Sequence, residues 1–140
     1  MGNDLMRFSV AMPEELLVRF DQLVARRGLA KNRSEVVRDL VRDALVEDEC
    51  ATPGAEVVGT LTIVFSHHAS DLQEKLHAIQ HAYYEVIVSS MHVHLDEHNC
   101  LEVIILRGDT GLVQGIANRI LGTKGVKTGR LVLTSTGKGL

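Results

Sequence analysis

The sequence predicts an α+β protein in which a strand–helix–helix segment precedes a longer segment of the order βαββαβ. Apolar residues alternate with polar ones where strands are expected and recur with helical spacing elsewhere. The pattern changes near residue 50, where residues 47–55 combine acidic side chains with Pro53 and Gly54. We therefore expect a first domain at residues 1–47, a linker at 48–55 and a second domain at 56–140.

The composition points to a cytoplasmic chain without a disulfide framework. Of its 140 residues 45% are apolar, only two are cysteines, and no apolar run approaches the roughly 18 residues of a membrane span. The first residues also lack the apolar core of a secretion signal. The net charge of −3 conceals a basic segment between Arg26 and Arg42, in which only Glu35 and Asp39 are acidic. Its basic residues are Arg26, Arg27, Lys31, Arg33, Arg38 and Arg42. Such local charge favours contact with phosphates.

The first domain is too small to fold alone. Residues 6–12 alternate as a half-buried strand, a first helix follows Pro13 and ends at Gly28, and a second begins at Asn32. Asn32 and Glu35 have the spacing of a capping box. One strand needs a partner, so we expect a two-fold dimer whose strands pair antiparallel as a ribbon.

In the second domain we expect strands at 56–66, 85–95, 100–106 and 126–135, and helices at 70–83 and 109–121. This is the ferredoxin-like, or ACT-like, order, with both helices on one face of a four-stranded sheet.

Both faces of this sheet are predicted to be apolar. The expected helix-facing residues are Leu61, Ile63, Phe65, Met91, Val93, Leu95, Leu101, Val103, Ile105, Leu131 and Leu133. The opposite face would carry Val58, Val64, Val86, Val88, Ile104, Leu106 and Val132. Because water would cover such a face at a cost, we expect it to pack on another subunit, giving an oligomer larger than a dimer.

Three potential metal ligands converge in the predicted hairpin. His92 and His94 are two residues apart in one strand and share a face, and the register places Cys100 opposite His94, with Cβ atoms about 5 Å apart. We expect them on the face opposite the helices, where a second subunit packs. Imidazole and thiolate ligands suit zinc, copper and nickel.

A fourth ligand is expected from His81 of a different subunit. The helix at 70–83 should pack on the other side of its own sheet from the ligands, and His81 is turned away from the core side of that helix. The alternative is that the histidine pair is only a surface or interface pair, and the neighbouring cysteine weighs against this. The remaining histidines are expected to be solvent-exposed, or at most a weak secondary metal site; they are His67, His68, His77 and His98.

The first domain carries a candidate DNA-binding surface. Arg7, Ser9 and Ala11 face outward from the expected ribbon, which fits the major groove, where arginine reads guanine. Asn32 and Arg33 lie at the start of the second helix, whose free N–H groups can bind phosphate.

Taken together, these motifs resemble the nickel-responsive ribbon–helix–helix repressors along nearly the whole chain. In the first domain the resemblance rests on Arg7-Phe8-Ser9-Val10, Arg26-Arg27-Gly28, Asn32-Arg33-Ser34-Glu35 and Arg38-Asp39. In the second it rests on Gln80-His81, His92-Val93-His94, Cys100-Leu101-Glu102 and Arg107-Gly108-Asp109.

The resemblance implies a homotetramer, a dimer of dimers, that represses nickel-uptake genes at a palindromic operator. It implies one square-planar nickel ion per subunit, bound by His92, His94 and Cys100 of one chain and His81 of another. It also implies base reading by Arg7, Ser9 and Ala11.

A second cation site, often filled by potassium, is implied at Glu35 and Asp39. The chain departs from the family at two places. Ala11 stands where threonine is more usual, and Ala69-Ser70 replaces a Lys-Arg pair that contacts DNA in some members.

We expect metal to favour the arrangement of the tethered domains that spans both operator half-sites. One rival is a regulator of this architecture that senses zinc, copper, cobalt or a small molecule. The other is a small metallohydrolase, but four protein ligands leave no open metal position and Glu102 is a weak candidate base, so we expect no enzyme activity.

Overall fold

The computed structural model describes residues 4–29, 31–69 and 71–140 and contains two compact units, one up to Asp43 and one from Ala44 onward. Within the described residues, no helix is both long and apolar enough to cross a membrane. The predicted order of elements is found throughout the second unit. Position 70, where we expected a helix to begin, lies outside the described residues.

The first helices begin where the sequence predicted. Helix α1 spans Glu14–Arg26, directly after Pro13, and Gly28 follows it with a φ of +123°, a conformation that favours glycine. Helix α2 spans Arg33–Ala51. The Asn32 side chain accepts a hydrogen bond from the backbone N–H of Glu35 at 2.9 Å, which confirms the predicted N-cap.

Two expectations for this part of the chain differ from the structure. Residues 6–12 are not in a strand, and Phe8 and Val10 are exposed. The physical reason is that a strand needs a hydrogen-bonding partner, which a single chain does not supply here. In addition, α2 continues to Ala51, so the first half of the expected linker is helical. The turn comes only at Pro53, because proline disfavours helical geometry in the residue before it.

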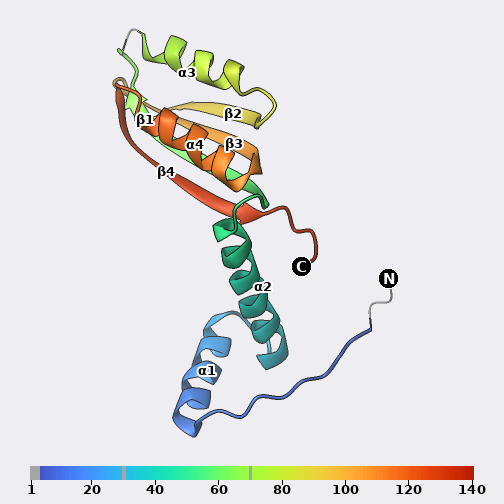
Figure 1. The fold of residues 1–140 in the computed structure, drawn as a ribbon. Coiled ribbons are helices and arrows are strands. Elements are labelled where there is room, and N and C mark those ends of the chain that lie inside the picture. The colour runs from blue at the N-terminus through green and yellow to red at the C-terminus, as the bar shows by residue number, and fades with distance from the viewer. Residues whose placement is uncertain (1–3, 30, 70) are drawn as a thin grey trace. The chain divides into compact units, whose positions relative to one another are not determined.

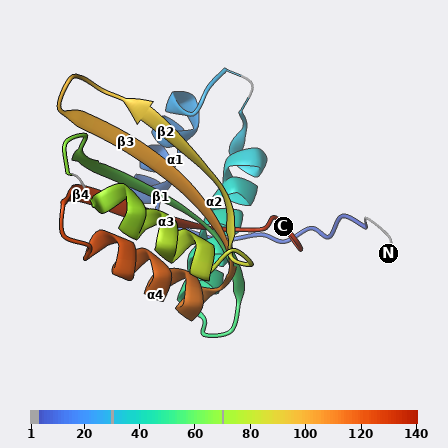
Figure 2. The same ribbon diagram turned by 90° about the horizontal axis from the view of Figure 1, so that it is seen from above.

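The second unit is a four-stranded antiparallel sheet covered on one face by two helices (Figures 1 and 2). The strands are β1 (Glu56–Ser66), β2 (Ile87–His94), β3 (Asn99–Asp109) and β4 (Val126–Ser135), in the order β2-β3-β1-β4. The helices are α3 (Leu72–Ala82) and α4 (Thr110–Leu121). This arrangement confirms the predicted α+β class and places β2 at an edge of the sheet.

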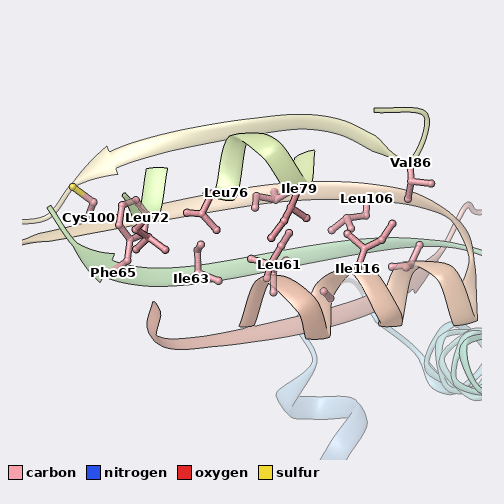
Figure 3. Packing of buried hydrophobic residues seen from close by; sticks show 14 of the residues in the cluster. Leu61, Ile63, Phe65, Leu72, Leu76, Ile79, Val86, Cys100, Leu106 and Ile116 are labelled. Carbon is pink, nitrogen blue, oxygen red and sulfur yellow. The ribbon is translucent and has the colours of Figure 1, made fainter. Parts of the chain in front are cut away.

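The core lies between the sheet and the two helices (Figure 3). Leu61, Ile63 and Phe65 of β1 are fully buried and face the helices, as predicted. A Cβ atom at Gly59 would come within 2.9 Å of Val113 and 3.0 Å of Leu131, so glycine allows α4 to approach the sheet closely. Burial of this apolar face is the main force that holds the unit together.

The prediction was wrong about which face of β3 meets the helices. Phe65 pairs with Cys100 and Leu61 with Ile104, so the helix-facing residues of β3 are Cys100, Glu102, Ile104 and Leu106, all buried. The expected set Leu101, Val103 and Ile105 is on the other face. The apolar pattern of β3 suits either face, and the face that meets the helices also carries the charged residue Glu102. In the structure the Glu102 carboxylate accepts a hydrogen bond from Gln80 of α3 at 3.0 Å, which makes its burial tolerable.

Because β2 pairs with β3, the predicted face of β2 was also wrong. Met91 is opposite Val103 and Val93 is opposite Leu101, so both lie on the face away from the helices. We call this surface the outer face of the sheet. It is apolar, with Val58, Val64, Met91, Val93, Leu101, Val103, Ile105 and Val132. Met91 and Val132 are 60% and 58% exposed.

Candidate metal centre

His94 and Cys100 are direct partners across the β2–β3 hairpin, as the sequence predicted. The His94 Nδ1 atom lies 3.5 Å from the Cys100 Sγ atom. The ring of His92 lies beside that of His94, with centroids 4.9 Å apart, and His92 pairs with the buried Glu102. Two imidazoles and a thiol therefore share one region of one face.

That face is the helix-covered one, which corrects the expectation that the ligands lie on the outer face. Cys100 is fully buried near Phe65 and Leu72 (Figure 3), and register carries His92 and His94 to the same side. Both histidines are nevertheless exposed because they lie on the edge strand β2. The ligands still converge although the predicted face was wrong. The same error applied to both strands, so the predicted register between them was correct.

The turn between β2 and β3 holds this pair in register. The Asp96 carboxylate accepts hydrogen bonds from the side chain of Asn99 and from the backbone N–H groups of His98 and Asn99. These bonds hold the pKa of Asp96 below its usual value, and the hydrogen bond from the Asn99 side chain is the largest cause. A fixed turn gives His94 and Cys100 a fixed separation.

His67 belongs to this cluster, although we expected it to be solvent-exposed or, at most, part of a weak secondary metal site. Among the described residues, ligand atoms of His67, His94 and Cys100 all lie within 4.8 Å of one another. The His67 Nδ1 atom is 3.4 Å from the Cys100 Sγ atom. His67 follows β1, which pairs with β3 through Ser66 and Asn99, so a correct register between β1 and β3 could have identified it.

His81 is exposed near the end of α3 and does not join the cluster in this chain. Helix α3 begins at Leu72 near Cys100 and extends toward Leu106 at Ile79 (Figure 3). The nine helical steps from Leu72 to His81 correspond to about 13.5 Å. Helix length, rather than the intervening sheet that we expected, thus separates His81 from the ligands of its own chain.

Two further histidines continue the cluster. The Nε2 atom of His68 is 3.3 Å from the Nδ1 atom of His98, and the ring centroids of His67 and His68 are 5.5 Å apart. Both His68 and His98 are exposed. His77 is exposed on α3.

The candidate DNA-binding residues are accessible. Arg7, Ser9 and Ala11 are exposed in the segment before α1. Arg33 forms two hydrogen bonds of 2.7 Å with the carboxylate of Asp21, so its guanidinium joins the start of α2 to α1. This hydrogen-bonded pair lowers the pKa of Asp21 and raises that of Arg33.

The residues expected at a second cation site lie in the first turns of α2. Asp39 accepts hydrogen bonds from Lys31 at 2.8 Å and from Arg42 at 3.3 Å. The Lys31 hydrogen bond is the largest contribution to the lowered pKa of Asp39. Glu35 is exposed.

The donor set fits a late first-row transition metal. Thiolate and imidazole are the ligands that nickel, zinc and copper share, and hard cations such as magnesium prefer oxygen. His94 and Cys100 are already close enough for one ion to bind both after small side-chain rotations. Glu102 is buried and pairs with His92 across the ladder, so a carboxylate lies next to that histidine, and carboxylates commonly accompany metal-bound histidines.

Both parts of the chain match models of known protein families. Residues 58–134 match the family model described as the NikR C-terminal nickel-binding domain, and residues 6–48 match the ribbon–helix–helix protein, copG family. An uncharacterised protein of Thermotoga maritima has a similar fold, with a TM-score of 0.50, 16% identity, and coverage of 56% of this chain and 96% of that one.

Curated relatives with the name of a nickel-responsive regulator match almost end to end. The Pyrococcus horikoshii protein is 48% identical over 98% of this chain and 99% of its own. The Thermococcus kodakarensis protein is 49% identical over 97% and 98%, and the Geobacter sulfurreducens protein 49% over 100% and 99%. This family consists of DNA-binding regulators rather than enzymes. With a nickel-binding domain joined to a ribbon–helix–helix domain, the chain belongs to the family of nickel-responsive regulators.

Proposed function

We propose that this protein is a nickel-dependent repressor that binds a palindromic operator of nickel-uptake genes in the cytoplasm. The observation that carries the proposal is the convergence of His94 Nδ1 and Cys100 Sγ, 3.5 Å apart beside His92. Nickel would be held by these three residues and by His81 of a second subunit, one ion per chain. The ion then joins two chains, which makes nickel a signal for assembly.

The position of α3 supports our proposal that a second chain contributes His81. Gln80 donates a hydrogen bond to Glu102, so its side chain reaches the sheet of its own chain. The next residue along a helix is turned by about 100°, which directs His81 away from that sheet. His81 is exposed there and free to meet the exposed edge of another subunit, where His92 and His94 lie.

Two unpartnered apolar surfaces support a dimer of dimers. In the first domain, which we propose as residues 1–47, the exposed Phe8 and Val10 would pair across a two-stranded ribbon. In the second, proposed as residues 56–140 after a connection at 48–55, the outer face of the sheet would meet another copy. Exposed apolar patches of this kind commonly mark interfaces.

The proposed DNA contacts use the ribbon and the start of α2. Arg7, Ser9 and Ala11 would reach base edges in the major groove, and Asn32 and Arg33 would contact phosphates. Asp21 neutralises part of the Arg33 charge but also fixes its position. Potassium at Glu35 and Asp39 would have to displace Lys31 from the Asp39 carboxylate.

Nickel and operator should then strengthen each other. If nickel binds the operator-competent assembly better than other arrangements, linkage requires that operator also increases nickel affinity. The regulatory effect therefore depends on sharing of the ion between chains, more than on its affinity for one chain.

The sharpest test mixes two inactive variants. His81→Gln removes the donated ligand, and His94→Gln removes a resident ligand, so each variant alone should lose nickel-dependent operator binding. A refolded mixture contains oligomers in which a His81→Gln chain supplies intact His92, His94 and Cys100. Its His94→Gln neighbour supplies an intact His81. Recovery of nickel-dependent operator binding in the mixture supports the shared site. If the mixture stays inactive while both variants remain folded and oligomeric, the ligands do not come from two chains.

A further inference from the structure

His67 offers a third ligand to the buried thiol of its own chain. Its backbone N–H donates a hydrogen bond to the His98 carbonyl at 2.8 Å, which fixes the loop after β1 beside the β2–β3 turn. Its Nδ1 atom lies 3.4 Å from Cys100 Sγ, and His94 Nδ1 lies 3.5 Å from the same sulfur. All three donors are contributed by one chain.

We propose that His67, His94 and Cys100 form a single-chain site for zinc or another ion that prefers tetrahedral coordination. The two nitrogen–sulfur separations carry this assignment. A tetrahedral ion with a metal–sulfur bond of about 2.3 Å and a metal–nitrogen bond of about 2.05 Å places sulfur and nitrogen about 3.5 Å apart. Both nitrogen–sulfur distances agree with that value.

A square-planar ion would require these side chains to rotate. With the same bond lengths, adjacent sulfur and nitrogen ligands would be about 3.1 Å apart, and opposite ones about 4.4 Å apart. The two observed distances match neither value. His67 and His94 are exposed, so the fourth tetrahedral position is open to water.

The single-chain site would prevent zinc and similar ions from producing the response to nickel. It shares His94 and Cys100 with the proposed nickel site, so one ion excludes the other. An ion that takes His67 in place of His92 and the partner's ligand is complete within one chain and joins no subunits. This consequence rests on the proposed function, whereas the site itself does not depend on it.

The test compares His67→Gln with a matched control, His68→Gln, which removes the neighbouring exposed histidine. Zinc affinity is measured by competition with a chromophoric chelator, and cobalt reports geometry through the intense visible bands of tetrahedral ions. His67→Gln should lower zinc affinity by at least about tenfold, because even the loss of an outer-shell partner costs that much. It should also weaken the tetrahedral cobalt bands. His68→Gln should change neither.

Two nickel measurements separate this proposal from the shared nickel site. His67→Gln should keep the nickel affinity of the unmodified protein, and His81→Gln should lose nickel affinity while it keeps zinc. The proposal is overturned if His67→Gln binds zinc as tightly as His68→Gln does, or if His81→Gln loses zinc along with nickel. If His81→Gln leaves nickel affinity unchanged, the shared nickel site fails instead, and the zinc result still decides the single-chain site.

Discussion

His94 lies directly opposite Cys100 in the β2–β3 ladder, with 3.5 Å between its Nδ1 atom and the thiol sulfur. The chain has only one other cysteine, Cys50, which is partly buried at the end of α2 and lies outside this cluster. Burial, as the larger cause, raises the pKa of the Cys50 thiol, which makes it a poor metal ligand. The two cysteines therefore form a matched pair for testing the metal centre.

Cys100→Ser should remove the thiolate-to-nickel charge-transfer band and lower nickel affinity by about 10- to 100-fold or more. Cys50→Ser should leave both unchanged. The band is followed by absorption spectroscopy during nickel titration, and affinity by competition with a chelator. An unchanged band in Cys100→Ser, or loss of the band in Cys50→Ser, would show that the assignment of the sulfur ligand to Cys100 is wrong.

The site was predictable from sequence as far as strand period and hairpin register allow. His92 and His94 share a face because strands have a period of two, and the short hairpin places Cys100 opposite His94. Which face they share was not predictable. Residues 100–106 are apolar on both sides, and the buried Glu102 depends on Gln80, a contact between residues far apart in sequence.

His67 was missed for a related reason. It approaches Cys100 only because β1 and β3 pair with Phe65 opposite Cys100, and the sequence does not specify this long-range register. The expected strand at 6–12 was a different case. Its apolar alternation is clear, but a second strand must supply the hydrogen bonds, and the single chain leaves Phe8 exposed.

The outer face of the sheet should control assembly. Met91 lies on this face and is 60% exposed, so Met91→Lys should leave the fold intact while it places a charge in the proposed interface. We expect the variant to shift toward smaller species in sedimentation velocity experiments. Gln114→Lys, on the exposed side of α4, is the control and should sediment like the unmodified protein. Equal sedimentation of both variants would mean that this face does not form the interface.

The ion pair between Asp21 and Arg33 should make the stability of the first domain depend on pH. The pKa of Asp21 is lowered in the folded chain, so the stabilisation is fully present above the unfolded value of about 3.9 and disappears as pH falls through the folded value. Asp21→Asn should thus be less stable than the unmodified protein at neutral pH and nearly equal to it in acid.

Thermal unfolding at several pH values would measure this effect, together with Arg33→Gln and the double variant. The effect should be small and should shrink at high salt, because both side chains are exposed. If the double variant loses as much stability as the two single variants added together, Asp21 and Arg33 do not interact in solution.

Arg7 should read a base, and this role can be separated from simple phosphate attraction. Arg7→Ala should lower affinity for the operator by about 1–3 kcal/mol and relax sequence preference at one position in each half-site, because a two-point contact to guanine is lost. Arg19→Ala removes the same charge from the exposed side of α1 and should have little effect on sequence preference. Both are measured with saturating nickel on operator variants at fixed salt. A loss of affinity in Arg7→Ala that is equal for all DNA sequences would assign Arg7 to the phosphate backbone, and the ribbon would then need another residue to read the operator.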